Sequence, residues 1–193
     1  MHKKYLDYNR KDLFDKIDKI SIESNGSQVV TKWDGRVISI ATVSPKYEIF
    51  DIKGYLKDKI NLIEKNFDIK KYYLLLKGGV QELVLLSDEI KIGDYQFQKS
   101  FFILNSSDKS RKLNFDTGLY AKDQNFYMIS KAKNVGLTKK HLKGVTKAAE
   151  DAIDQINDET FDDQISAISR LIGHRVHLSK IKDVLVDDPD VNI

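Results

Sequence analysis

Residues 72–86 read YYLLLKGGVQELVLL, and this stretch decides the fold. Two nearly unbroken apolar runs, 72–76 and 80–86, flank the pair Gly78-Gly79. Glycine tolerates the positive φ angles of a tight hairpin turn. Apolar runs that do not alternate with polar residues are typical of strands covered on both faces. The sequence therefore predicts a hairpin in the centre of a sheet.

Further turn signals predict that the sheet is an antiparallel meander. Asp34-Gly35 and Gly93-Asp94 each lie between two runs of strand character, as the turns of hairpins do. The remaining expected strands lie at residues 28–33, 36–41, 90–92, 95–104, 112–121 and 125–131.

Apolar residues at helical spacing predict helices before, within and after these strands. The expected helices span residues 9–20, 52–66, 138–156, 160–172 and 179–186. Asn9 and Thr138 are the expected N-caps of the first and third helices, and Thr160 with Asp163 resembles a capping box for the fourth. We therefore expect an α+β fold, an antiparallel β-meander sheet with an N-terminal helix, an inserted helix and a C-terminal helical segment.

Length and composition fit one globular domain. The chain has 193 residues, 41% of them hydrophobic and 32% charged, and no apolar run reaches the ~18 residues that span a bilayer. It has no cysteine, which excludes a thiol nucleophile, a cysteine-ligated metal and a disulfide framework. The N-terminus lacks the apolar stretch of a signal peptide. We expect a single α+β domain over 1–186, an acidic C-terminal tail over 187–193 and a cytoplasmic location.

Common catalytic motifs are missing from the sequence. It contains no phosphate-binding loop, no dinucleotide-binding glycine pattern, no zinc-protease pattern and no serine-nucleophile elbow. Asp151, Asp154 and Asp158 have the helical spacing that a metal-dependent nuclease uses, but the solvent-exposed face of an amphipathic helix is the favoured interpretation. His174 and His177, with Asp183, are candidate metal ligands, but the segment between helices is a poor frame for a metal site, and solvated side chains are the favoured interpretation. We expect no catalytic residue, no metal and no cofactor.

The best functional candidate is a basic region. The net charge is only +3, but residues 131–149 carry lysines and no acid, whereas residues 150–163 carry acids and no base. Lysines beside a helix N-terminus at Thr138 favour a phosphate backbone, and exposed aromatic rings favour stacked bases. The candidate nucleic-acid-binding residues are Arg111, Lys131, Lys133, Lys139, Lys140, Lys143, Lys147, Tyr120 and Tyr127.

The same residues have alternative interpretations. The rings fit a sheet core, and the lysines fit a solubilising helix face or internal pairs with the acids of 150–163. The dipolar helix pair and the acidic tail also fit a protein that docks onto a host or phage enzyme. Exposure of the lysines decides between these interpretations.

Three stretches resemble a known family. They are VSPKY at 43–47, LSDEIKIG at 86–93 and FILNSSDKS at 102–110. Together they resemble the phage- and plasmid-encoded family of domain of unknown function 932, over roughly residues 37–156.

Two motifs of that family carry the resemblance. Its N-S-H-D-G-S motif is matched by Asn105, Ser106, Asp108 and Ser110, with Ser107 and Lys109 departing from it. Of its R-V-V-C-x-N motif, only Gln124-Asn125 remains, because the arginine and cysteine are absent.

The resemblance implies an accessory product of a mobile element, and it carries over no established enzyme activity. The order of elements is similar in outline to that of single-strand annealing recombinases, which bind DNA in the basic groove of an oligomeric ring without ATP. We therefore expect a non-catalytic, homo-oligomeric protein of a phage or plasmid that binds nucleic acid, with single-stranded DNA as the expected partner and annealing as the expected role. The alternative is a mobile-element interaction protein that modulates an enzyme.

Overall fold

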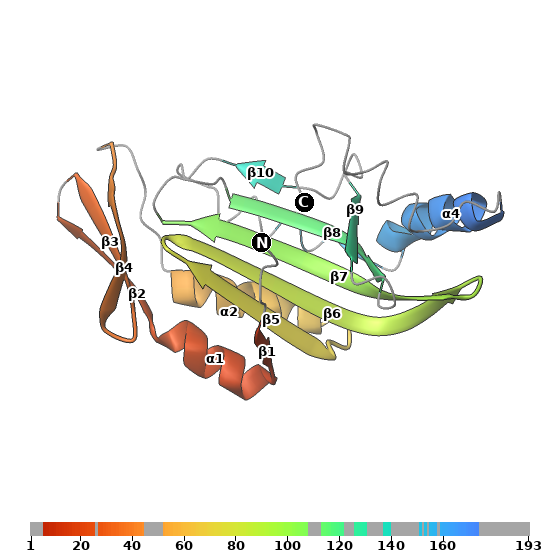
Figure 1. Cartoon of the computed structure of the whole chain (residues 1–193), viewed down its shortest axis with the longest axis horizontal. Coiled ribbons are helices and arrows are strands. Elements are labelled where there is room, and N and C mark those ends of the chain that lie inside the picture. The colour runs from red at the N-terminus through yellow and green to blue at the C-terminus, as the bar shows by residue number, and fades with distance from the viewer. Residues whose placement is uncertain are drawn as a thin grey trace.

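The computed structural model describes residues 6–25, 27–44, 52–107, 113–121, 126–130, 137–139, 151, 153, 155–157 and 159–173. Two antiparallel sheets and the helices around them form an α+β fold, which confirms the expected fold class. Figure 1 shows the smaller sheet and the last helix, α4, at opposite ends of the larger sheet. The expected tail at 187–193 lies outside the described residues.

The larger sheet is a meander centred on the predicted hairpin. Its strand order is β1-β5-β6-β7-β8-β10, and β9 pairs with β8 as well. All of these pairings are antiparallel. The strands are β1 (Leu6–Tyr8), β5 (Lys71–Lys77), β6 (Val80–Ile92), β7 (Tyr95–Ser106), β8 (Leu113–Ala121), β9 (Phe126–Ser130) and β10 (Leu137–Lys139).

The expected strands at 80–86 and 90–92 are one continuous strand. The register of β6 against β7 shifts between Leu86 and Glu89, so a bulge replaces the expected break. Ser87, inside the bulge, is buried and its hydroxyl donates to the Asp68 carbonyl at 3.1 Å. The turns at Gly78 and Gly93 have φ angles of +57° and +61°, as the sequence predicts for glycine in a hairpin.

The smaller sheet contains the predicted hairpin and a strand that the prediction missed. It consists of β2 (Ile20–Asn25), β3 (Gln28–Trp33) and β4 (Arg36–Thr42). Asp34 and Gly35 form the β3–β4 turn with φ angles of 52° and 76°. The first helix was expected to reach residue 20, but it ends at Asp18, and the Ile20-Ser21-Ile22 alternation continues as β2.

The helices α1 (Arg10–Asp18), α2 (Ile52–Glu64) and α4 (Glu159–Gly173) begin and end close to their expected positions. The Asn9 side chain caps α1 as predicted, because its Oδ1 accepts from the Asp12 amide at 2.8 Å. The predicted capping box of Thr160 and Asp163 is wrong, because the capping box of α4 lies three residues earlier. Asn157 and Thr160 instead exchange side-chain to backbone hydrogen bonds of 3.1 Å each.

Thr138 corrects another expectation. It lies in β10 and pairs with Asn114 of β8, so a helix does not begin at this residue. The preference of threonine for an N-cap is outweighed here by strand pairing, which β-branched residues also favour. Within the predicted third helix, Asp151 and Ile153 are helical.

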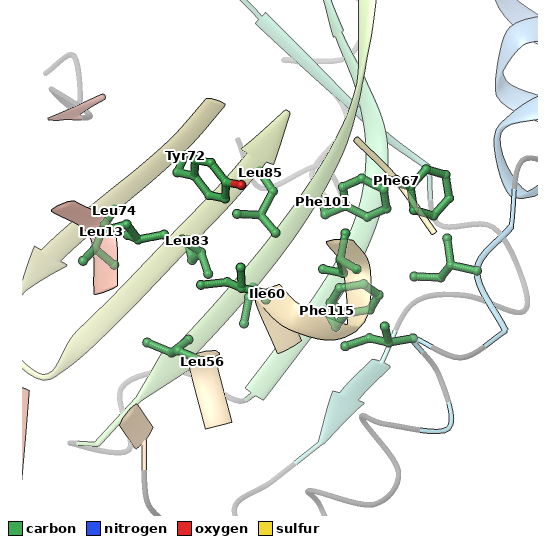
Figure 2. Packing of buried hydrophobic residues seen from close by; sticks show 14 of the residues in the cluster. Leu13, Leu56, Ile60, Phe67, Tyr72, Leu74, Leu83, Leu85, Phe101 and Phe115 are labelled. Carbon is green, nitrogen blue, oxygen red and sulfur yellow. The ribbon is translucent and has the colours of Figure 1, made fainter. Parts of the chain in front are cut away.

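The main core lies between one face of the larger sheet and the helices. Figure 2 shows Leu56 and Ile60 of α2 packed beneath strand residues such as Leu83 and Phe101. A smaller cluster of Val84, Leu86 and Phe102 comes from alternate positions of β6 and β7 and therefore lies on the opposite face. Within the described part of the chain, each helix is too short or too polar to span a bilayer.

Candidate nucleic-acid interface

Most of the predicted phosphate-binding residues fall outside the described structure. They are Arg111, Lys131, Lys133, Lys140, Lys143 and Lys147. Lys139 is described as a backbone position of β10, where it pairs with Leu113 of β8. Whether these cations form one surface therefore stays a prediction.

The structure does bring the two predicted stacking residues together. Tyr120 of β8 and Tyr127 of β9 are direct cross-strand partners. The Tyr120 ring is half-buried and packs against the cluster of Val84, Leu86 and Phe102. Lys139 lies at the other end of β8, seven residues or about 23 Å away along the strand. Because Thr138 lies in β10, it does not provide the helix N-terminus that was expected to bind a phosphate beside Lys139.

A groove that the sequence did not predict lies where α1, β1 and β5 meet the smaller sheet. Its volume is about 250 Å³. The topology positions its walls: Tyr8 pairs with Tyr72 of β5, and Trp33 ends β3 just before the Asp34-Gly35 turn. The lining residues are Tyr8, Lys16, Trp33, Ile38, Leu74, Leu75, Leu76 and Gly78.

Lys16 provides the positive charge of this groove. Its Nζ lies 5.6 Å from the centroid of the Trp33 ring, within the range of a cation–π interaction. The neighbouring Lys19 is different, because it forms an ion pair of 3.3 Å with Asp34. Among the described residues, Lys16 has no carboxylate within ion-pair distance. Asp12 and Asp15 line an adjoining hollow of about 360 Å³.

Two aromatic residues of the groove also carry hydrogen-bonding groups. Burial raises the pKa of the Tyr8 hydroxyl above its ordinary value of 10.0, so this group stays a neutral donor at physiological pH. The Trp33 Nε1 is buried and has no hydrogen-bond partner among the described residues. The groove therefore combines apolar walls, two rings, a cation and polar hydrogens.

A buried polar cluster holds the smaller sheet against the end of the larger one. The Thr31 and Ser107 hydroxyls are hydrogen-bonded to each other, and the Ser107 hydroxyl also donates to the Gly79 carbonyl at 3.1 Å. The Gln81 amide donates to the same carbonyl at 2.7 Å, and Asn105 donates to Gln81 at 2.6 Å. Each of the four side chains is at least 97% buried.

This cluster gives a structural role to Asn105, which matches the resemblance motif, and to Ser107, which departs from it. Asn105 and Ser107 belong to the stretch NSSDKS, and their side chains hold the β5–β6 turn and β3 in place. These contacts are internal, so both residues act as scaffold. Asp108, Ser110 and the following Arg111 lie outside the described residues.

No metal centre is found in the part of the chain that the structure describes. It holds no group of three histidine, cysteine or acidic side chains placed to bind an ion. Of the nuclease alternative, Asp151 is exposed on a helix, whereas Asp154 and Asp158 lie outside the described residues. His174 and His177 lie outside them too.

Comparison with known proteins finds no family model, no curated protein and no solved structure that matches this chain. The resemblance to domain of unknown function 932 therefore stays a prediction, as does the outline similarity to annealing recombinases.

Proposed function

We propose that this protein binds single-stranded nucleic acid without catalysing a reaction on it. The observation that carries the proposal is a groove in which the half-buried Trp33 ring lies beside the Lys16 ammonium group and the half-buried Tyr8 ring lines the same space. Among the described residues, this ammonium group has no carboxylate within ion-pair distance. Proteins that bind single strands without sequence preference combine aromatic rings for the bases with cations for the phosphates. The groove offers both within one small volume.

Single-stranded ligands fit this chemistry better than duplexes. An aromatic side chain stacks on a base that has been freed from the stack of a duplex, as in a single strand. Much of the groove is lined by aliphatic side chains, which suit a base better than the charged phosphates on the outside of a duplex. In the proposed complex, a base packs on Trp33 and its phosphate approaches Lys16. DNA is the expected strand, and homo-oligomerisation and an annealing role are proposed with it from the sequence resemblance.

A binding titration with matched variants tests the proposal. A labelled oligo-dT is titrated at low salt against the wild type, Trp33→Leu, Lys16→Ala and Lys11→Ala. Loss of one stacked base weakens binding by about 1–3 kcal/mol, so Trp33→Leu should weaken it by about fivefold to about 150-fold. Lys11 is exposed on the same helix, so its variant controls for the loss of one charge. Unchanged binding by Trp33→Leu would overturn the proposal.

The predicted lysines are tested by the salt dependence. Each neutralised phosphate of a single strand contributes about −0.7 to the slope of log K against log salt. Replacing Lys139, Lys140 and Lys143 together should flatten the slope by about two units, whereas Lys16→Ala should flatten it by about 0.7. An unchanged slope in the triple variant would show that these three lysines do not contact the phosphates. It would not contradict binding in the groove.

The second candidate function is that of an interaction protein. Val37 and Ile40 of β4 are 53% and 63% exposed, the highest exposure among large hydrophobic side chains of the described residues. Exposed apolar patches favour protein contacts. Sedimentation of the wild type and of Val37→Ser/Ile40→Ser tests whether these two residues form a protein interface. Self-association that the double variant loses would support this patch as a protein interface.

A further inference from the structure

Helix α4 packs a polar side chain into the core without satisfying it. The buried side chains of α4 are Phe161, Gln164 and Ile168, one turn apart. Gln164 is only 7% exposed, yet neither its Nε2 nor its Oε1 has a hydrogen-bond partner among the described residues. A buried amide that leaves water without gaining partners lowers the stability of the packed state.

Strand β8, which α4 contacts, also holds a polar group that the described residues leave unsatisfied. Helix α4 contacts β8 and β6, and Thr117 of β8 is 1% exposed. Its hydroxyl also lacks a hydrogen-bond partner among the described residues. The Gln164 amide therefore gains hydrogen bonds to water when the helix leaves, which opposes the apolar burial of Phe161 and Ile168.

Phe161 covers a lysine and an aromatic ring. The Lys99 Nζ lies 5.4 Å from the Phe161 ring centroid and 5.7 Å from that of Phe67. The Phe67 and Phe161 rings meet edge to face, with centroids 5.9 Å apart. Departure of α4 removes Phe161 and leaves the Phe67 ring beside the Lys99 ammonium group.

We propose that α4 is a reversible cover over Lys99 and Phe67, and that single-stranded nucleic acid binds there when the helix opens. The inference rests on the proposed function for its ligand. The closed state is held by Phe161 and Ile168 and weakened by Gln164, which sets the balance between closed and open. A strand that binds the uncovered residues shifts the population toward the open state.

Two substitutions of Gln164 shift this balance in opposite directions. Gln164→Leu removes the unsatisfied amide and should slow hydrogen exchange of the amides in 159–173 about tenfold. Gln164→Glu buries a charge and should accelerate it by at least as much. Ser166 is exposed on the same helix, so Ser166→Glu controls for the added charge and should change exchange little.

Hydrogen exchange of α4 and oligo-dT affinity are measured on the same full-length variants. We expect Gln164→Leu to bind more weakly than the wild type and Gln164→Glu more tightly, in step with the exchange rates. If the α4 amides exchange at the same rate in the wild type and in Gln164→Leu, the proposal that α4 is a reversible cover is wrong. Gln164→Leu adds no buried charge, so this comparison remains valid even if Gln164→Glu fails to fold. If the Gln164 variants change the exchange rate of α4 but not the affinity for oligo-dT, the strand does not bind at Lys99 and Phe67. Binding in the groove is tested separately by the Trp33 and Lys16 variants.

Discussion

The hydroxyl of Thr31 in β3 is hydrogen-bonded to the hydroxyl of Ser107, the residue immediately after β7, although the two residues are 76 positions apart in the chain. This bond joins the smaller sheet to the larger one. Because β3 also carries Trp33 and β5 carries Leu74, the contact fixes the two walls of the groove relative to each other. The buried cluster is thus a positioning element for the proposed site.

Removing one partner of this bond should destabilise the fold. Ser107→Ala leaves the buried Thr31 hydroxyl without its partner, which costs about 1–3 kcal/mol of unfolding free energy. Urea denaturation measures the loss. The double variant Thr31→Val/Ser107→Ala should lose less than the sum of the two single variants, because no orphaned hydroxyl remains. Thr42→Val, at an exposed position of β4, is the control and should change stability by less than about 0.5 kcal/mol. Strict additivity of the two changes would show that the hydroxyls do not interact.

Stability should fall at alkaline pH because of Tyr72. Burial, and then a hydrogen bond of 2.5 Å to the Glu64 carboxylate, raise the pKa of Tyr72 above its ordinary value of 10.0. The folded state thus favours the protonated phenol. This contribution is fully present below pH 10 and is lost progressively as the pH rises above it.

Urea denaturation between pH 7 and pH 11 checks the sign. Tyr72→Phe should be less stable than the wild type at pH 7 and should show a shallower decline above pH 10. The decline should not vanish, because burial also raises the pKa of Tyr8 and Tyr73. A variant curve parallel to the wild-type curve would contradict the assignment to Tyr72.

The β6–β7 turn should tolerate substitution less well than the β3–β4 turn. Gly35 and Gly93 both have positive φ angles, 76° and 61°. A Cβ on Gly35 meets no atom within 4 Å, whereas a Cβ on Gly93 lies 3.1 Å from Ile172 Cγ2 of α4. Gly35→Ala should cost about 1–2 kcal/mol from its backbone conformation alone, and Gly93→Ala should cost more. Thermal denaturation of the two variants measures the difference. Equal losses of stability would indicate that the Ile172 side chain moves away from the new methyl group at no cost.

The local elements could be predicted because their signals are local. Glycine or Asp-Gly at 34–35, 78–79 and 93–94 predicted three hairpins, and all three are present. The strand β2 was missed because its short alternation follows a helical pattern directly. Thr138 was assigned to a cap because threonine suits both caps and strands, and only the pairing with β8 decides between them.

The groove could not be predicted, because its residues meet only in the folded chain. Tyr8, Lys16 and Trp33 come from a strand, a helix and the end of a second sheet, with no spacing that signals their contact. A tryptophan beside a hairpin turn is consistent both with core packing and with exposure. The cross-strand pair of Tyr120 and Tyr127 was closer to prediction, since a hairpin places such residues opposite each other.

Intrinsic fluorescence tests the central claim most directly, because Trp33 is the single tryptophan of the chain. Titration with oligo-dT at low salt should quench its emission saturably, and the apparent affinity should fall with added salt. Lys16→Ala should weaken the affinity, and Lys11→Ala should leave it near that of the wild type. An oligonucleotide that binds without changing Trp33 emission, or that does not bind at low salt, would contradict the account.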